Sequence, residues 1–247
     1  MSSKSFLRTV VATTLLATGL AAHAGTLTMS SWLFGSGNTV AAGAPNYAGL
    51  AGGFKGTLSG MNNPAFDLNP VEMYCVDLGQ YITINTGTSY SVKIDGESGT
   101  TNFTVMSVAS VFSAAVSNRL SELVSYAKSA GTIVDTSVES TSLQLAIWNT
   151  VYDTDNTLTA PVTPATAGNP GSFSDGSSYK VYANTLLTNS LNFGITKQLY
   201  VLRSAANQDQ LFWIDTPAGR QLPEPASLAL VALALGGAGL ASRRRRA

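Results

Sequence analysis

The chain contains a single cysteine, Cys75, and it stands in the apolar and aromatic run YCVD. Sixty-nine positions later, Gln144 stands in a similar run, LQLAIW. A cysteine thiolate can attack the side-chain carbonyl of a glutamine, expel ammonia and leave an internal thioester. That reaction needs no activating enzyme when the folded chain holds the two side chains together, because proximity replaces activation.

Each residue alone has an ordinary interpretation. A free cysteine is among the most often buried residue types. Gln144 alone would be an ordinary helix residue, and Trp148 alone an ordinary aromatic residue of the core. The pair is informative because both residues occur in one chain that has no second cysteine to compete for the sulfur.

The two runs resemble the paired motifs of the thioester domains of bacterial surface adhesins. In that family an aromatic residue or leucine precedes the cysteine, an aliphatic residue and Asp or Asn follow it, and the glutamine motif is close to Gln-x-Ala-Ile-Trp. Both motifs occur here in the family's order, and Cys75 and Gln144 would form the crosslink. The supporting positions of the motifs are Tyr74, Asp77, Ala146, Ile147 and Trp148.

This resemblance implies a mainly β (α+β) fold, a β-sandwich or barrel with an inserted helical segment that bears the thioester glutamine. It implies a thioester between the two parts, shielded from water by Tyr74, Trp148 and Tyr152. It also implies covalent attachment to an amine-bearing surface or matrix target, with no cofactor. The familiar adhesins end in a different sorting signal, so a matrix polymer, a neighbouring cell or another surface protein is the expected target.

The N-terminus has the features of a secretory signal peptide over residues 1–24. Lys4 and Arg8 give a positive start, a short apolar run follows, and small residues precede the expected cleavage between Ala24 and Gly25. We expect this segment to be removed.

The C-terminus, residues 222–247, has the features of a second targeting signal. A Pro-Glu-Pro sequence precedes sixteen small or apolar residues and a cluster of arginines. Sixteen helical residues reach roughly 24 Å, short of a bilayer core of about 30 Å, and snorkelling arginines can supply the difference. The residues of this signal are Pro223, Glu224, Pro225, Arg243, Arg244, Arg245 and Arg246.

This segment resembles the PEP-CTERM sorting signal of bacteria with an outer membrane and exopolysaccharide. The resemblance implies an exosortase-type processing enzyme as partner and transient anchoring by the C-terminal helix. Delivery to the cell surface or extracellular matrix would follow. The positive-inside tendency leaves the main domain, residues 25–221, outside the inner membrane.

Composition excludes several function classes. Residues 25–221 carry eight Lys and Arg against thirteen Asp and Glu, a net charge of −5, which argues against nucleic acid as a partner. The sole histidine, His23, lies in the signal peptide, so histidine-based nucleophilic catalysis and histidine-built zinc sites are excluded. We expect no metal site and no enzyme activity.

The hydrophobic pattern predicts strands first, helices next and strands again. Short strands are expected over 26–69, a strand at 71–78, and a meander formed by 81–84 and 90–94. A helical insert is expected at about 103–152, although 105–116 fits either a buried helix or a strand. One helix around 120–127 would be capped by Ser117 or Asn118 and stop near Gly131.

A second helix is expected from about Ser142 to Tyr152, capped by Ser140 or Thr141 and with Gln144 in its first turn. Residues 153–178 are predicted to form a long surface loop. Its DTDN sequence lacks the glycine and the final glutamate of an EF-hand calcium loop. A short helix at 179–187 and closing strands at 197–204 and 210–214 complete the pattern.

Two alternatives stay open. The chain could be a non-reactive structural protein of the exopolysaccharide matrix whose cysteine remains free. It could also be a glycosidase that uses a pair of carboxylates, although its acids are scattered singly and mostly near turn signals.

Overall fold

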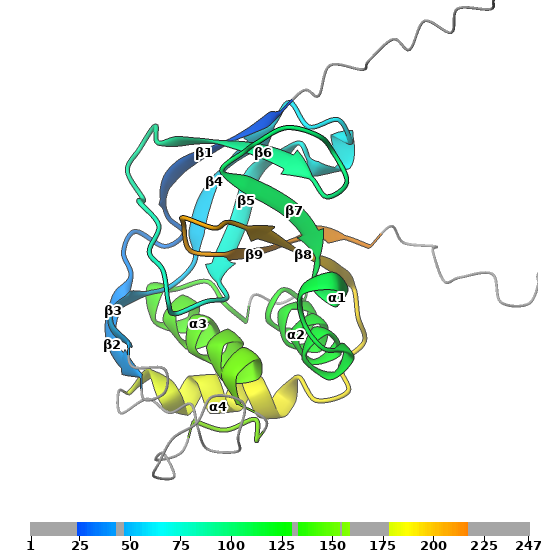
Figure 1. The fold of residues 1–247 in the computed structure, drawn as a ribbon. Helices are drawn as coiled ribbons and strands as arrows, with labels where there is room; N and C mark the ends of the chain where they lie inside the picture. The colour runs from blue at the N-terminus through cyan, green and yellow to red at the C-terminus, as the bar shows by residue number, and fades with distance from the viewer. Residues whose placement is uncertain (1–23, 43–46, 130–132, 154, 159–177, 217–247) are drawn as a thin grey trace, which may run out of the picture.

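Strands with alternating buried and exposed residues close into a barrel that carries a cluster of helices at one end (Figure 1). The computed structural model describes residues 24–42, 47–129, 133–153, 155–158 and 178–216. Within these ranges the barrel order is β1-β4-β5-β9-β8-β7-β6, and β2 and β3 form a separate hairpin. The strands are β1 (Gly25–Trp32), β2 (Asn38–Ala42), β3 (Tyr47–Ala51), β4 (Phe54–Ser59), β5 (Leu68–Cys75), β6 (Ser89–Ile94), β7 (Phe103–Ser107), β8 (Lys197–Arg203) and β9 (Gln210–Asp215).

The barrel interior is filled by the inward-facing residues of each strand. In β1, Leu27 and Met29 are fully buried while their neighbours are at least partly exposed, the period of two that a half-buried strand requires. Leu58 and Met73 contribute from β4 and β5. Closure pairs every strand of the barrel on both sides, so the backbone hydrogen-bonding groups of its edges are satisfied internally.

The predicted meander is wrong. Residues 81–84 form no strand, and β6 pairs antiparallel with β1 and parallel with β7. The short return from β6 to β7 is held by side chains that cap the strand edges: Asn102 accepts the Ser91 N–H at 2.9 Å and Glu97 accepts the Ile94 N–H at 2.7 Å. The other barrel pairs are antiparallel.

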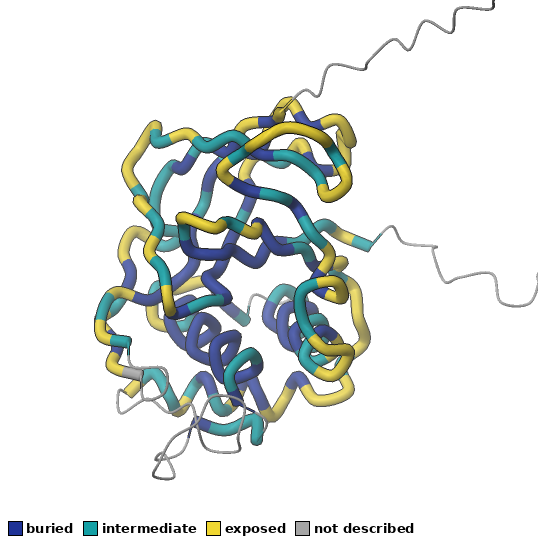
Figure 2. Tube along the Cα trace, viewed as in Figure 1, coloured by how far each residue is buried: buried dark blue, intermediate teal, exposed yellow. Residues whose placement is uncertain are grey.

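The helices are α1 (Val108–Val111), α2 (Ala114–Ala127), α3 (Ser137–Tyr152) and α4 (Tyr179–Asn189), and a 3-10 turn, η1, covers Pro64–Phe66. The ambiguous 105–116 stretch is therefore the end of β7 followed by α1 and the start of α2. In Figure 2, α2 and α3 are the most deeply buried helices, and in Figure 1 α4 crosses beneath them.

The predicted helix starts were too late. Ser113 caps α2, since its side chain accepts the Val116 N–H, and the helix ends at Ala127 rather than near Gly131, which lies outside the described residues. Thr136 caps α3 and forms a capping box with Glu139, so the helix begins five residues before the expected Ser142. Consequently Gln144 lies in the middle of a long helix, not in its first turn.

Helix α3 is buried on all sides: residues 140–150 are all buried. It contacts β5 and the β2–β3 hairpin on one side and α2 and α4 on the others. A helix that is buried on all sides lies in the core, and α3 is therefore the central helix of the helical cluster. The predicted mainly β fold with helical segments is confirmed, as are the helix near 179–187 and the two closing strands.

No helix of the described ranges is long and apolar enough to cross a membrane. The apolar stretch of the C-terminal signal lies outside those ranges, as do the signal peptide up to residue 23 and the loop residues 159–177.

Candidate functional site

The site lies where the barrel meets the helices. Cys75 is the last residue of β5, and Gln144 projects from the middle of α3 toward it. The Cys75 N–H donates to Gln144 Oε1 at 2.9 Å, and Gln144 Nε2 donates to the Cys75 carbonyl oxygen at 2.7 Å. The two predicted reactants are thus brought together, and both are buried.

The thiol of Cys75 lies among amide groups. Its sulfur donates to Gln208 Oε1 at 2.8 Å and accepts from Gln210 Nε2 at 3.5 Å. Burial raises the pKa of the thiol well above its ordinary value, partly offset by its hydrogen bond with Gln210. The sulfur is therefore held as a neutral thiol, with Asp77 as the nearest negative charge that reinforces the shift.

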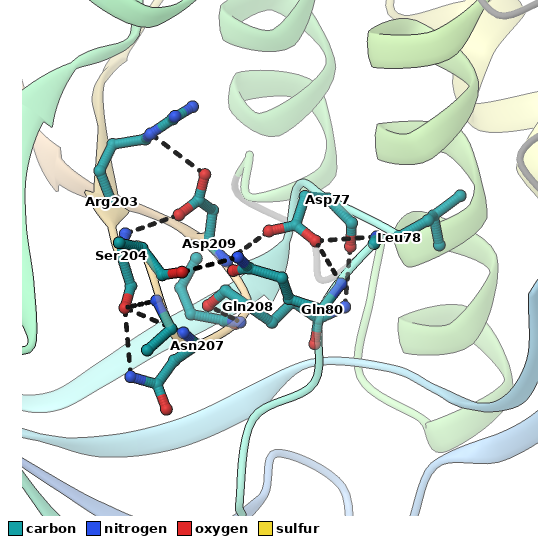
Figure 3. A network of polar contacts seen from close by, with 12 residues as sticks. Asp77, Leu78, Gln80, Arg203, Ser204, Asn207, Gln208 and Asp209 are labelled. Atoms are coloured by element: carbon teal, nitrogen blue, oxygen red, sulfur yellow. Dashed lines mark hydrogen bonds and ion pairs between the residues drawn. The ribbon is translucent and has the colours of Figure 1, made fainter.

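Asp77 acts as a clamp between two loops (Figure 3). Its Oδ1 accepts the backbone N–H groups of Gly79 and Gln80, and its Oδ2 accepts the Asp209 N–H at 2.8 Å. The Asp77 carbonyl oxygen accepts from Gln208 Nε2 at 2.8 Å, which fixes the carboxamide that faces the thiol.

A second carboxylate extends this clamp. Asp209 accepts the Ser204 N–H at 2.7 Å and pairs with Arg203 at 3.2 Å (Figure 3). Burial raises the pKa of Asp209 and Asp77 adds to the increase, while the Ser204 N–H and Arg203 oppose it. The carboxylates of Asp77 and Asp209 therefore hold the loops next to the thiol in place.

Tyr74, the predicted shield before the cysteine, is fully buried on the opposite face of β5. Its hydroxyl lies 3.1 Å from Ser140 Oγ, which also accepts the Gly53 N–H at 2.8 Å. A Cβ at Gly53 would lie 2.6 Å from the Tyr74 ring, so only glycine allows this approach. Tyr74 therefore locks β5 to the start of α3 rather than covering the sulfur.

Trp148 and Tyr152 follow Gln144 at one-turn intervals along α3. The Trp148 ring is buried and lies 5.0 Å from the Tyr47 ring, centroid to centroid. The Tyr152 hydroxyl accepts the Leu78 N–H at 3.0 Å, which ties the helix to the loop after Cys75. Ala146 and Ile147 are fully buried packing residues of α3.

A cavity of about 220 Å³ opens beside the pair. Cys75, Gln144 and Gln208 supply its polar surface, and Trp148 lies beside them. The remaining lining is largely aromatic and aliphatic: Trp32, Tyr47, Gly49, Leu50, Ala51, Gly52, Phe54, Tyr81, Ile82 and Ile84. The site can thus hold a reactive carbonyl in an apolar enclosure that a ligand can enter.

Three contributors escaped the sequence reasoning. Gln208 and Gln210 contact the sulfur from more than 130 positions away in the chain, and no local signal marks them. Tyr47 contributes from the hairpin, where burial and the nearby Cys75 raise its pKa to about 12. Among the described residues, no group of three His, Cys, Asp or Glu side chains could hold a metal ion.

Comparison with known families gives one match: residues 221–246 correspond to the PEP-CTERM protein-sorting motif. Comparisons with curated proteins and with solved structures returned no match. The match contains the predicted signal residues from Pro223 to Arg246, which all lie outside the residues that the structure describes.

The C-terminal match defines the class: this is an exported protein carrying a sorting signal recognised by an exosortase. It is anchored transiently in the membrane and directed to the cell surface. The cleavage between Ala24 and Gly25 stays a prediction; β1, the first strand of the described residues, begins at Gly25.

Proposed function

We propose that this exported protein forms an internal Cys75–Gln144 thioester and uses it to attach covalently to amine-bearing targets at the cell surface or in the extracellular matrix. The observation that carries the proposal is the pairing of the Gln144 carboxamide with both backbone polar groups of Cys75. Two short hydrogen bonds fix the electrophile beside the residue that bears the nucleophile, which is the orientation that intramolecular reaction needs.

The hydrogen bonds suit the chemistry of thioester formation. The Cys75 sulfur would attack Cδ of Gln144, and the negative charge that develops on Oε1 would be stabilised by the Cys75 N–H already donating to it. The C–N bond then breaks, the thiol proton leaves with the amide nitrogen, and one ammonia departs.

No internal base of the usual type assists this step, because residues 25–221 contain no histidine. Gln208 accepts the S–H hydrogen bond without taking the proton, and so orients the thiol rather than activating it. Formation would therefore depend on the folded geometry and quicken with rising pH. The chain is proposed to act once as an attachment group, not as a turnover enzyme.

The decisive measurement is the intact mass of protein purified without reductant or amines. We expect the measured mass to be lower than the mass calculated from the sequence by that of one ammonia, and we expect no thiol that can be alkylated. Cys75→Ala and Gln144→Ala should each remove the deficit, while Gln198→Ala, a glutamine exposed on β8, should leave it in place. Full mass with a free Cys75 in fresh protein would refute the proposal.

The same contacts also favour one alternative, a non-reactive structural protein of the exopolysaccharide matrix. A carboxamide bonded to a strand end is a sound structural clamp between barrel and helix, whether or not it reacts. This alternative predicts full mass and no adducts, so the mass measurement separates the two functions.

A further inference from the structure

The cavity beside Cys75 and Gln144 has an entrance formed by two exposed apolar side chains. Leu50 on β3 is 51% exposed and Tyr81 is 72% exposed, and both line the cavity. Exposed large apolar residues that flank a concave site are typical of ligand-binding surfaces. The polar surface of that site includes the Gln144 carboxamide, the group that the proposed function makes reactive.

The cavity carries no charged side chain among the described residues that line it. Asp77, which acts electrostatically on the thiol, and its neighbour Asp209 do not line the cavity and are engaged by backbone N–H groups and Arg203. An incoming carboxylate would thus meet apolar surface and a background of negative charge, with no cation to pair with it. Burying an unpaired charge is costly.

We infer that this cavity is the acceptor site and that it selects a primary amine at the end of an unbranched apolar stem, of the lysine side-chain type. Amines that carry a carboxylate within the reach of the cavity are disfavoured. The inference rests on the proposed function, since it names the acceptor class of that same thioester.

The lining explains the preference. Trp32, Tyr47 and Trp148 line the cavity, and aromatic rings attract an alkylammonium group as it enters. Deeper in, apolar surroundings disfavour the charged form, so the amine loses its proton before it reacts. Its methylene stem is left against Leu50 and Ile82, where burial of each CH₂ stabilises the complex.

The capture step then balances. The neutral amine nitrogen bonds to Cδ of Gln144, the C–S bond breaks, and one amine proton passes to the departing thiolate of Cys75. The products are a substituted amide on Gln144 and a free thiol.

The test measures adduct formation by intact mass, with rates compared at equal concentrations of unprotonated amine. We expect n-pentylamine to react about tenfold or more faster than methylamine, because four additional methylenes are buried. We also expect n-propylamine to react faster than β-alanine, which has a similar stem but ends in a carboxylate. Equal rates within each pair would overturn the inference.

A pair of matched variants locates the preference. Leu50→Asp places a charge at the entrance and should lower the n-pentylamine rate toward that of methylamine. Leu191→Asp changes a leucine of similar exposure, 47%, that does not line the cavity, and should keep the wild-type preference. An unchanged preference in Leu50→Asp would show that the cavity does not bind the stem.

Binding without reaction separates this inference from the proposed function. In Cys75→Ala, or in Gln144→Met if that variant folds better, n-pentylamine should change the fluorescence of Trp32 and Trp148 saturably, and at lower concentration than β-alanine. If the wild-type protein shows no mass deficit but the variant binds n-pentylamine in this way, the thioester is refuted and the amine-binding site is kept. If the wild-type protein shows the deficit but the variant responds equally to n-pentylamine and β-alanine, only the acceptor site is refuted.

Discussion

Burial of the Cys75 thiol affects its acid–base behaviour as well as its access to solvent. The sulfur lies against two glutamine side chains, and the described residues that line its cavity include no cation that could stabilise a thiolate. In the unreacted chain the residue is therefore a protonated and poorly reactive thiol, which protects an unpaired cysteine from oxidation outside the cell.

This environment gives a pH prediction for Gln144→Met, which cannot form the thioester. Because the pKa of Cys75 is raised, the thiolate is scarce at neutral pH and becomes more abundant as pH rises through the alkaline range. We expect alkylation by a small reagent to be slow and to keep accelerating above a pH of about 10, where the thiolate of an ordinary cysteine, with a pKa of about 8.5, is already fully formed. The control is the same variant in denaturant, which should show the ordinary profile; a rate that is half-maximal at a pH of about 8.5 in the folded protein would contradict the structure.

At the scale of elements, α3 carries the site, and its first turn depends on the Thr136–Glu139 capping box. Glu139 accepts the N–H groups of Asp135 and Thr136 at 3.0 Å. Partial burial raises the pKa of Glu139, but these hydrogen bonds and those of the Thr136 and Asp135 side chains outweigh it, and the pKa is lowered overall.

The cap predicts a stability change with a defined pH dependence. Thr136→Ala should lower the free energy of unfolding by about 1 kcal/mol, while Thr185→Ala on the exposed face of α4 should change it less. Since the pKa of Glu139 is lowered in the folded state, its contribution is present above the unfolded pKa of about 4.3 and is lost as pH falls below it. Denaturant unfolding of Glu139→Gln and wild type should therefore converge in acid; a constant difference would contradict this role.

The elements also show where sequence reasoning succeeds and where it stops. The strand that contains Cys75 and the closing strands were predictable, because short apolar runs bounded by turn residues are local signals. The first of them spans Leu68–Cys75 and not the predicted 71–78. The start of α3 was misplaced because Ser140 and Thr141, the expected caps, are residue types typical of helix N-caps. The Thr136-x-x-Glu139 spacing was the better signal.

Residues 81–84 alternate like a strand but contact Gln208 instead, through the Tyr81 carbonyl oxygen. Alternation alone does not supply a neighbouring strand. For the site, the motif predicted the pairing of Cys75 with Gln144, while Gln208 and Gln210 could not be found, since their relation to the sulfur exists only after the barrel closes.

At the scale of the whole molecule, a Cys75–Gln144 bond would close a loop of sixty-nine residues that includes β6, β7, α1, α2 and the first half of α3. By the loop-entropy argument developed for disulfides, such a crosslink stabilises the fold by about 3–5 kcal/mol, less any strain.

We therefore expect Cys75→Ala to melt at a lower temperature than the thioester form and to keep its fold. Calorimetry with far-ultraviolet circular dichroism checks both points. Wild-type protein opened with ammonia before measurement is the matched control, because aminolysis restores the Gln144 carboxamide and the Cys75 thiol and removes only the bond. Identical melting temperatures for the intact and ammonia-opened forms would show that the bond is absent or strained.

The pairing of β8 with β9 has a mechanical consequence. Lys197 begins β8 and lies opposite Asp215 at the end of β9, where the two side chains form an ion pair. If a target is attached to Gln144 as proposed, tension would pass along the chain to Lys197 at the start of β8. Holding the chain on its C-terminal side would load β9 through Asp215. Because antiparallel ladder bonds lie perpendicular to the strands, tension at these adjacent ends loads them one at a time. Single-molecule pulling between Gln144 and the C-terminal side should therefore unzip this hairpin at low force, so the attachment would lengthen under load before its covalent bond is stressed. A single high-force shear event would contradict this load path.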